Sequence, residues 1–129
     1  LCDLVVHSWK DLPVESRAGT HIAMTLPRED VRDVLMIPEV VWQKAEQTKI
    51  LTVLTSSPRR VYNLAPLLPK ILPGRPRIEF KTVRGNVPTR LRKMHEEGGA
   101  LVLAKAGLDR LLTAEADGFM PDSVRALIK

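Results

Sequence analysis

Apolar runs of strand length recur along this 129-residue chain, and polar or amphipathic stretches separate them. Residues 49–54 (KILTVL) and 100–104 (ALVLA) are nearly continuous apolar runs, as in buried strands, whereas residues 77–83 alternate apolar and polar side chains. A shorter apolar run, residues 34–37, ends at Pro38. The predicted strands are residues 3–8, 21–26, 49–54, 77–83 and 100–104.

Amphipathic stretches between these runs predict helices. The clearest helix start is residues 55–58 (TSSP), where hydroxyl side chains precede a proline in the first turn. Pro66 and Pro69 are expected to shorten this helix. The other predicted helices are residues 40–47, 87–96, 105–112 and 121–128. Because strands alternate with helices, the chain predicts an α/β fold in which a mainly parallel sheet is flanked by helices.

Three polar segments follow predicted strands at points where helices begin. They are HSWKDLP (residues 7–13), TSSPRR (residues 55–60) and VRGNVPTR (residues 83–90). Ligands of α/β sheets bind beyond the carboxyl ends of the strands, and helix N-termini there present N–H groups that favour anions. Arginine side chains beside them bind carboxylates in a bidentate manner. The pattern therefore predicts an anion-binding α/β domain.

The arginines of these segments differ in how strongly they indicate a ligand. Arg59 and Arg60 stand in the first turn of a helix, where cations oppose the helix dipole and lower stability. A pair that breaks this local rule indicates either anion binding or two solvated side chains, and the sequence leaves both open. Arg84 follows a strand directly and is a ligand candidate, whereas Arg92 and Lys93 are expected to form a solvated face.

Lys10 and Asp11 leave the first predicted strand together. An aspartate beside a lysine and an apolar wall can act as a general acid or base, or can stabilise a cationic intermediate. Alternatively, Asp11 caps a turn before Pro13 and Lys10 is solvated, and spacing alone favours this second interpretation.

The charge narrows the class of partner. Twenty Lys and Arg residues against 15 Asp and Glu residues give a net charge of +5, which indicates an anionic partner such as nucleic acid or a polycarboxylate. Aromatic residues make up 4% of the chain, so the aromatic platforms that stack nucleic-acid bases are missing and nucleic acid is a weak candidate. The single cysteine, Cys2, allows no intramolecular disulfide and no cysteine metal cluster, and no metal site is expected. No apolar run approaches the ~20 residues of a membrane span.

Five motifs together resemble one known family. VHSWKDLP, PREDVRD, TSSPRR, VRGNVPTRLRKM and LAKAGLDRL occur in this order along the chain. Their order and spacing are similar to those of the porphobilinogen deaminase (hydroxymethylbilane synthase) family. The resemblance implies a transferase of tetrapyrrole and haem biosynthesis that joins four porphobilinogens into hydroxymethylbilane and releases ammonia.

The resemblance also implies roles for individual residues. Asp11 matches the catalytic aspartate, which interacts with pyrrole nitrogens. Loss of ammonia leaves an electrophilic azafulvene, so a carboxylate that stabilises the positive pyrrole lowers the barrier. The residues that match those binding the acetate and propionate groups of cofactor or substrate are Ser8, Lys10, Thr55, Ser57, Arg59, Arg60, Arg84, Gly85 and Arg110. Porphobilinogen is a polycarboxylate, which is consistent with the basic excess.

The family has three domains, and the first two resemble type II periplasmic binding proteins. By this correspondence, residues 1–30 are the C-terminal part of the first domain and residues 31–129 are most of the second. The dipyrromethane cofactor of the family is linked to a cysteine in the third domain, and Cys2 does not match that cysteine. We therefore expect these 129 residues to need the remaining family segments, or a companion chain, for turnover. A cytoplasmic location is expected, and an organellar one is also compatible.

Four positions depart from the family pattern. Leu54 stands in place of glycine, Trp9 in place of a smaller apolar residue, Val31 in place of proline, and Gly99 in place of aspartate. Leu54 is expected to crowd the site. The departures leave open a non-catalytic paralogue that serves as a structural, anion-binding or RNA-binding module. Fold analogy alone also suggests a solute-binding protein for a small carboxylate.

Overall fold

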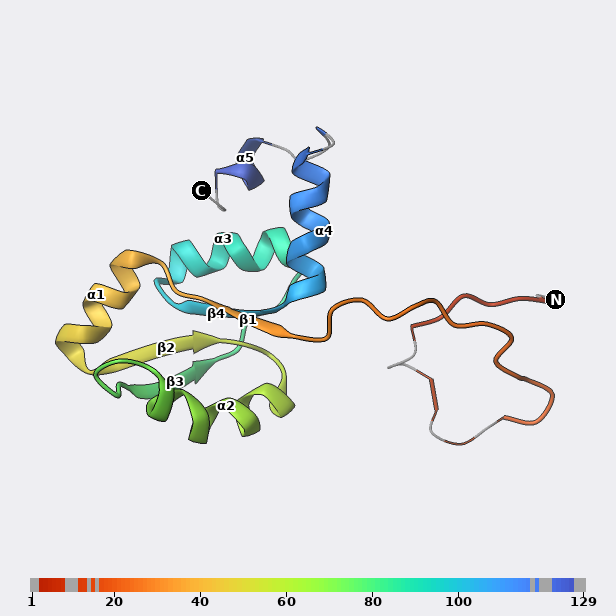
Figure 1. Ribbon diagram of the computed structural model, residues 1–129, viewed down its shortest axis with the longest axis horizontal. Helices are drawn as coiled ribbons and strands as arrows, with labels where there is room; N and C mark the ends of the chain where they lie inside the picture. The colour runs from red at the N-terminus through yellow and green to blue at the C-terminus, as the bar shows by residue number, and fades with distance from the viewer. Residues whose placement is uncertain are drawn as a thin grey trace.

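A mixed sheet lies at the centre of the computed structural model, which describes residues 3–8, 12–13, 15, 17–116, 118 and 122–126 (Figure 1). In chain order the elements are β1 (Asp33–Met36), α1 (Glu39–Thr48), β2 (Ile50–Leu54), α2 (Pro58–Ile71), β3 (Arg77–Lys81), α3 (Val87–Glu97), β4 (Ala100–Ala104), α4 (Lys105–Ala116) and α5 (Asp122–Arg125). The four strands are ordered β1-β4-β2-β3. β2 pairs in parallel with β3 and β4, and β1 pairs with β4 in the antiparallel sense.

Helices flank the sheet, as the sequence predicts, and they cover both of its faces. Alternate residues of β4 point to opposite faces: Ala100 and Val102 pack in one buried cluster, and Leu101 and Leu103 pack in the other. The first cluster lies beneath α1 and α2, which contribute Val41, Ala45 and Leu68. The second lies beneath α3, which contributes Leu91 and Met94. The α/β architecture with helices on both faces is therefore confirmed, and two of the three strand pairings are parallel.

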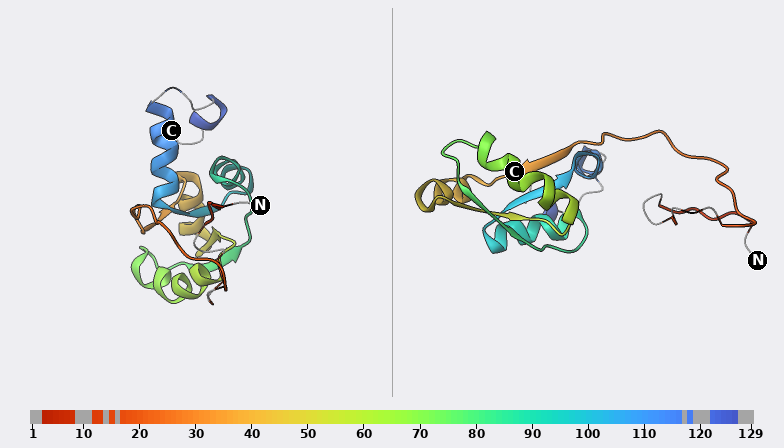
Figure 2. Two further views of the ribbon diagram at one scale, coloured as in Figure 1. Left: turned by 90° about the vertical axis from the view of Figure 1, so that its right-hand side faces the viewer. Right: turned by 90° about the horizontal axis from the view of Figure 1, so that it is seen from below.

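The described residues 3–31 form an N-terminal arm that extends away from the rest of the molecule, which is called the body below (Figures 1 and 2). The sequence predicts strands at residues 3–8 and 21–26, but neither segment forms a strand in the structure, so this prediction is wrong. Side chains of both segments are exposed, with Val6 at 94% and Met24 at 80%. A strand needs a neighbour for its backbone groups and a core for its apolar face, and the body supplies neither to this arm.

Two helices also differ from their predicted lengths. α2 continues through Pro66 and Pro69 to Ile71, because Leu68 is buried on the sheet and Leu64 packs beside it. Packing of this apolar face outweighs the backbone hydrogen bonds that the two prolines remove. α4 extends to Ala116 rather than ending at residue 112. Of the predicted helix 121–128, the structure describes residues 122–126, and Asp122–Arg125 are helical.

Leu54 lies in the hydrophobic core and does not crowd the surface where the predicted ligands gather. Its side chain is fully buried against Val83, Leu91 and Met94. Gly99 lies directly beside it, and a Cβ added to Gly99 would stand 3.0 Å from Leu54 Cγ. Two departures from the family pattern, Leu54 and Gly99, therefore fit one another: the large residue occupies space that the small one leaves.

This fit predicts how substitutions combine. Gly99→Ala should destabilise the protein by about 1–3 kcal/mol, because the branched carbon of Leu54 is held by its neighbours and cannot move aside. Leu54→Ala alone should cost about 2–5 kcal/mol through the cavity it leaves. In the double variant the new methyl group enters that cavity, so its loss should be smaller than the sum of the two by about 1 kcal/mol.

Equilibrium unfolding in urea, followed by circular dichroism, measures these free energies. Val40→Ala is the matched control, because Val40 is 73% exposed on α1 and its truncation should change the free energy of unfolding by under about 0.5 kcal/mol. Strictly additive losses in the double variant would show that the two positions do not share space.

Candidate anion-binding site

The parallel pairing of β2, β3 and β4 places the carboxyl ends of these strands at one edge of the sheet. Leu54 of β2 is paired with Lys81 of β3 and with Leu101 of β4, so the segments that follow the three strands leave from the same side. β1 runs in the opposite direction and begins at this edge, with Asp33 paired with Ala104. This edge, called the carboxyl edge below, brings together two of the three segments that the sequence predicts as ligand-binding, residues 55–60 and 83–90.

The hydroxyl groups of Thr55 and Ser57 accept backbone hydrogen bonds at the start of α2. Ser57 is the N-cap, and its Oγ accepts a hydrogen bond from the Arg60 N–H at 3.4 Å. Thr55 is buried at 3% exposure, its N–H donates to the Lys81 carbonyl at 2.9 Å, and its Oγ1 accepts from the Ser57 N–H at 3.3 Å. These bonds tie residues 55–57 to Lys81 at the end of β3, so the start of α2 has a defined position relative to that strand.

The turn before α3 is held by its own helix. Asn86 caps α3, and its Oδ1 accepts from the Thr89 N–H at 2.9 Å. Gly85 has φ +127°, and a Cβ there would lie 2.7 Å from Thr89 Cγ2, so only glycine fits. Arg90 Nε donates to the Gly85 carbonyl at 2.7 Å, and Lys93 Nζ donates to the Arg84 carbonyl at 3.3 Å.

Arg92 and Lys93 of α3, which the sequence predicts to form a solvated face, differ from one another in the structure. Lys93, expected to be solvated, bonds to the backbone of the turn that carries Arg84. Arg92 instead pairs with Glu96 at 3.5 Å on the exposed surface, in agreement with the prediction. Lys93 and Arg90 thus fix the backbone from which Arg84 projects.

The predicted arginines fall into two groups. Arg59, Arg84 and Arg110 are exposed, and within the described part of the chain their guanidinium groups have no hydrogen-bond or ion-pair partner. Arg60 instead forms a bidentate ion pair with Asp33, from Nε to Oδ2 at 2.9 Å and from Nη2 to Oδ1 at 2.5 Å. Its Nη1 also lies 3.5 Å from the Val102 carbonyl. Arg60 therefore joins α2 to β1, and Asp33 is a partner that the sequence analysis missed.

The remaining predicted residues lie apart from these. Ser8 is exposed on the arm, where its carbonyl lies 3.1 Å from His7 Nδ1, and the arm extends away from the carboxyl edge (Figure 2). Lys10 and Asp11 lie outside the described residues. Arg110 lies on α4, beyond its first turn. The structure thus gathers Thr55, Ser57, Arg59, Arg60, Arg84 and Gly85 in the segments leaving the carboxyl edge.

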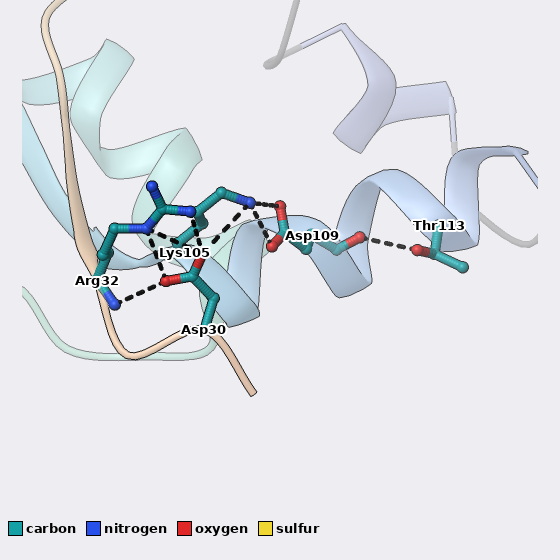
Figure 3. A network of polar contacts seen from close by, with 5 residues as sticks. All are labelled: Asp30, Arg32, Lys105, Asp109 and Thr113. Carbon is teal, nitrogen blue, oxygen red and sulfur yellow. Dashed lines mark hydrogen bonds and ion pairs between the residues drawn. The ribbon is translucent and has the colours of Figure 1, made fainter. Parts of the chain in front are cut away.

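A charged network stands where the arm joins the body (Figure 3). Asp30 accepts from the Arg32 N–H at 2.9 Å and from Arg32 Nε at 3.0 Å, and Lys105 Nζ lies 4.0 Å from its Oδ2. Asp109 accepts from Lys105 Nζ at 2.8 and 2.6 Å. The hydrogen bonds from Arg32, aided by its charge and by that of Lys105, lower the pKa of Asp30 well below its usual range. The i,i+4 spacing of Lys105 and Asp109 was a sequence signal for part of this network.

These features define a class of protein: an α/β domain with unpaired arginines, hydroxyl groups and helix N-termini at one edge of its sheet, a combination that favours anions. Unpaired guanidinium groups offer bidentate hydrogen bonds to carboxylates, which is the chemistry that the acetate and propionate groups of dipyrromethane, the cofactor implied by the family resemblance, would require. Two hollows of the body lie at the opposite edge of the sheet, beside α1 and the start of β2, so they do not contribute to this surface. In the described part of the chain, no cluster of side chains has the composition of a metal site. Nor is any helix there long and apolar enough to cross a membrane.

Comparison with known proteins identifies the family. The model of the porphobilinogen deaminase dipyromethane cofactor binding domain matches residues 1–125. The chain is 46% identical over 110 residues to a porphobilinogen deaminase of Moorella thermoacetica, covering 84% of this chain and 33% of that protein. It is 41% identical over 112 residues to one of Lachnospira eligens, covering 84% and 35%. No solved structure matches. The chain belongs to the porphobilinogen deaminase family and spans about a third of the length of these curated relatives.

The lowered pKa of Asp30 predicts a pH dependence. A carboxyl whose pKa is lower in the folded than in the unfolded protein contributes stability above the unfolded value, and that stability is lost as the pH falls through the folded value. The ordinary value for this group is 3.8. The difference in free energy of unfolding between the parent protein and Asp30→Asn should therefore be constant from about pH 7 to about pH 5 and shrink below about pH 4.

Urea unfolding of both proteins across this pH range measures the difference. Glu79→Gln is the control, because Glu79 forms an exposed 3.3 Å pair with Arg77 on the edge strand β3. A stabilising difference that grows on acidification would contradict the assignment of the lowered pKa.

Proposed function

We propose that the protein containing this chain is a porphobilinogen deaminase, a transferase that joins four porphobilinogens into hydroxymethylbilane with release of ammonia. The match of residues 1–125 to the cofactor-binding domain of the family supports this activity. The observation that carries the proposal is the pair of exposed, unpaired arginines, Arg59 and Arg84, on neighbouring segments of the carboxyl edge. These two side chains have no ion-pair partner within the described residues, and a polycarboxylate substrate supplies one.

The body binds and orients carboxylates in this proposal. Arg59 and Arg84 contact acetate or propionate groups through bidentate hydrogen bonds, and Arg110 adds a further contact from α4. The hydroxyl groups of Thr55 and Ser57 and the open backbone of Gly85 line the same approach. Arg60 contributes positive charge while Asp33 holds its guanidinium in place. When bound, dipyrromethane supplies the pyrrole end to which new porphobilinogen units are added.

The arm supplies the acid–base chemistry in this proposal. Asp11 accepts a hydrogen bond from a pyrrole N–H, and its negative charge stabilises the positive charge that develops as ammonia leaves. Ser8 and Lys10, on the same segment, bind carboxylates of the pyrrole that Asp11 contacts. Turnover therefore needs the arm and the arginines of the carboxyl edge to meet across one substrate.

The domain assignment follows the same correspondence. Residues 1–30 belong to the first domain of the family and residues 31–129 to most of the second, and the junction network at Asp30 and Arg32 lies at this boundary. The type II periplasmic-binding-protein fold is supported by the strand order β1-β4-β2-β3 with one antiparallel strand. The cofactor is attached through a cysteine of another domain, and the protein works in the cytoplasm or in an organelle.

The intact denaturing mass of the gene product, purified from its own source, tests the proposal. A covalent increment equal to dipyrromethane, together with consumption of porphobilinogen, is the expected result. A protein with no covalent group and no consumption would overturn the proposal and favour a non-catalytic binding module. RNA binding with a steep dependence on salt would then identify the module as a nucleic-acid binder.

A substitution at the carboxyl edge tests the role of the unpaired arginines. Arg84→Gln should raise KM for porphobilinogen roughly 10- to 150-fold, because a charge-assisted hydrogen bond to a carboxylate contributes about 1.5–3 kcal/mol. Arg92→Gln is the matched control, since Arg92 lies nearby on α3 but pairs with Glu96, and its KM should change less than about twofold. Steady-state kinetics of the full-length, cofactor-loaded enzymes measure both values. An equal effect of the two substitutions would show that general charge, and not a contact from Arg84, is responsible.

A further inference from the structure

The arm meets the body at a junction made by Asp30, Arg32 and Lys105. Lys105 is the first residue of α4 and directly follows the buried strand β4, so its backbone belongs to a rigid part of the body. Its N–H donates to the Arg32 carbonyl at 2.8 Å, and its ammonium lies 4.0 Å from the Asp30 carboxylate. Lys105 therefore contacts both the backbone of Arg32 and the side chain of Asp30.

The position of Lys105 at the start of α4 lowers the stability of that helix. A cation in the first turn of a helix opposes the helix dipole and destabilises the helix. Asp109, one turn further along α4, accepts from the ammonium at 2.6 and 2.8 Å and so holds it between two carboxylates (Figure 3). A residue that breaks a local rule and is then compensated by neighbours indicates a role beyond helix stability.

Beyond the junction, the described residues of the arm do not pack on the body. Met24 and Leu26 are each 80% exposed, and the hydrogen bonds of the Arg17–Thr20 turn stay within the arm. Within the described residues, the direction in which the arm leaves is therefore set where Asp30 and Arg32 contact Lys105. Ser8, Lys10 and Asp11 all lie on the far side of this point along the chain.

We propose that Lys105 is a positioning residue, whose ammonium group latches the arm to the body through the Asp30 carboxylate, next to the backbone bond to Arg32, and thereby sets how Asp11 approaches the arginines of the carboxyl edge. The catalytic consequence rests on the function proposed above, whereas the latch itself does not. Arg59 and Arg84 lie outside the latch, so its loss leaves their contacts with carboxylates intact and disturbs the alignment of Asp11 and of the residues beside it on the arm.

Amide hydrogen exchange and steady-state kinetics of the full-length gene product test the two parts separately. In Lys105→Met, exchange of a peptide spanning residues 28–33 should accelerate about fivefold, since the contacts removed are partly exposed ion pairs. Asp30→Asn should give the same change, and the double variant should add little to either single variant. The kcat for porphobilinogen should fall about fivefold with a smaller rise in KM, because Arg59 and Arg84 still bind carboxylates, and Lys105→Arg should restore both exchange and kcat.

Arg92→Met is the control, because it removes an i,i+4 ion pair with Glu96 that lies on α3 and away from the junction. It should alter neither the exchange of residues 28–33 nor kcat. Unchanged exchange in Lys105→Met, or equal acceleration in Arg92→Met, would overturn the latch. Accelerated exchange with unchanged kcat in an active enzyme would overturn its positioning role. If the gene product has no deaminase activity, the exchange result still decides whether the latch exists, while the proposed function fails independently.

Discussion

The pairing of β4 with both of its neighbours is the constraint on which the rest of the structure depends. β4 is central and apolar on both faces, so α1 and α2 pack on one side and α3 on the other. Its parallel contact with β2 sets the carboxyl edge from which the predicted ligand-binding segments leave. Its antiparallel contact with β1 brings Asp33 to that same edge, and Asp30 and Arg32 with it. One strand therefore positions both the arginine surface and the junction with the arm.

At the carboxyl edge, some charged side chains form ion pairs within the protein, and others face solvent. Arg60 is braced by Asp33, and the side chain of this arginine is 14% exposed. A buried guanidinium without its carboxylate would be costly, so the pair has a structural function whether or not Arg60 also contacts a ligand. Arg59, its neighbour in sequence, is exposed and has no partner among the described residues. Two adjacent arginines with the same sequence signature thus differ because one faces β1 and the other faces outward.

The ion pairs at the junction with the arm also differ, because one is local in the sequence and the other joins distant segments. Arg32 is 73% exposed and contacts Asp30 within a single turn, whereas Lys105 reaches that carboxylate from the body. An exposed ion pair between residues close in the sequence, such as Arg32 and Asp30, contributes little to the free energy of unfolding, because solvent screens it. A contact between distant segments restricts their relative direction even when its energy is small. The junction therefore matters more for where the arm points than for the stability of the body.

Local patterns in the sequence were sufficient for the body. Period-two alternation in residues 77–83, the apolar run 100–104 and the hydroxyl cap before Pro58 all correspond to observed elements, because each depends on neighbours within a few residues. The arm was different: its apolar runs have strand character but no neighbour to pair with, and pairing is a property that a single segment does not possess. The length of α2 was misjudged for a related reason, since burial of Leu68 against the sheet outweighs two prolines.

By itself, the sequence determined the α/β class, the family and the set of basic and hydroxyl residues at strand-to-helix junctions, because these reside in short motifs and their order. Tertiary structure alone decided which of those charges are available. Asp33 lies 27 positions from Arg60 along the chain, and Leu54 and Gly99 share one volume although distant strands carry them. Such pairs form only when β1, β2 and β4 are aligned side by side, since sheet register and packing, and not local preference, bring their atoms within contact distance.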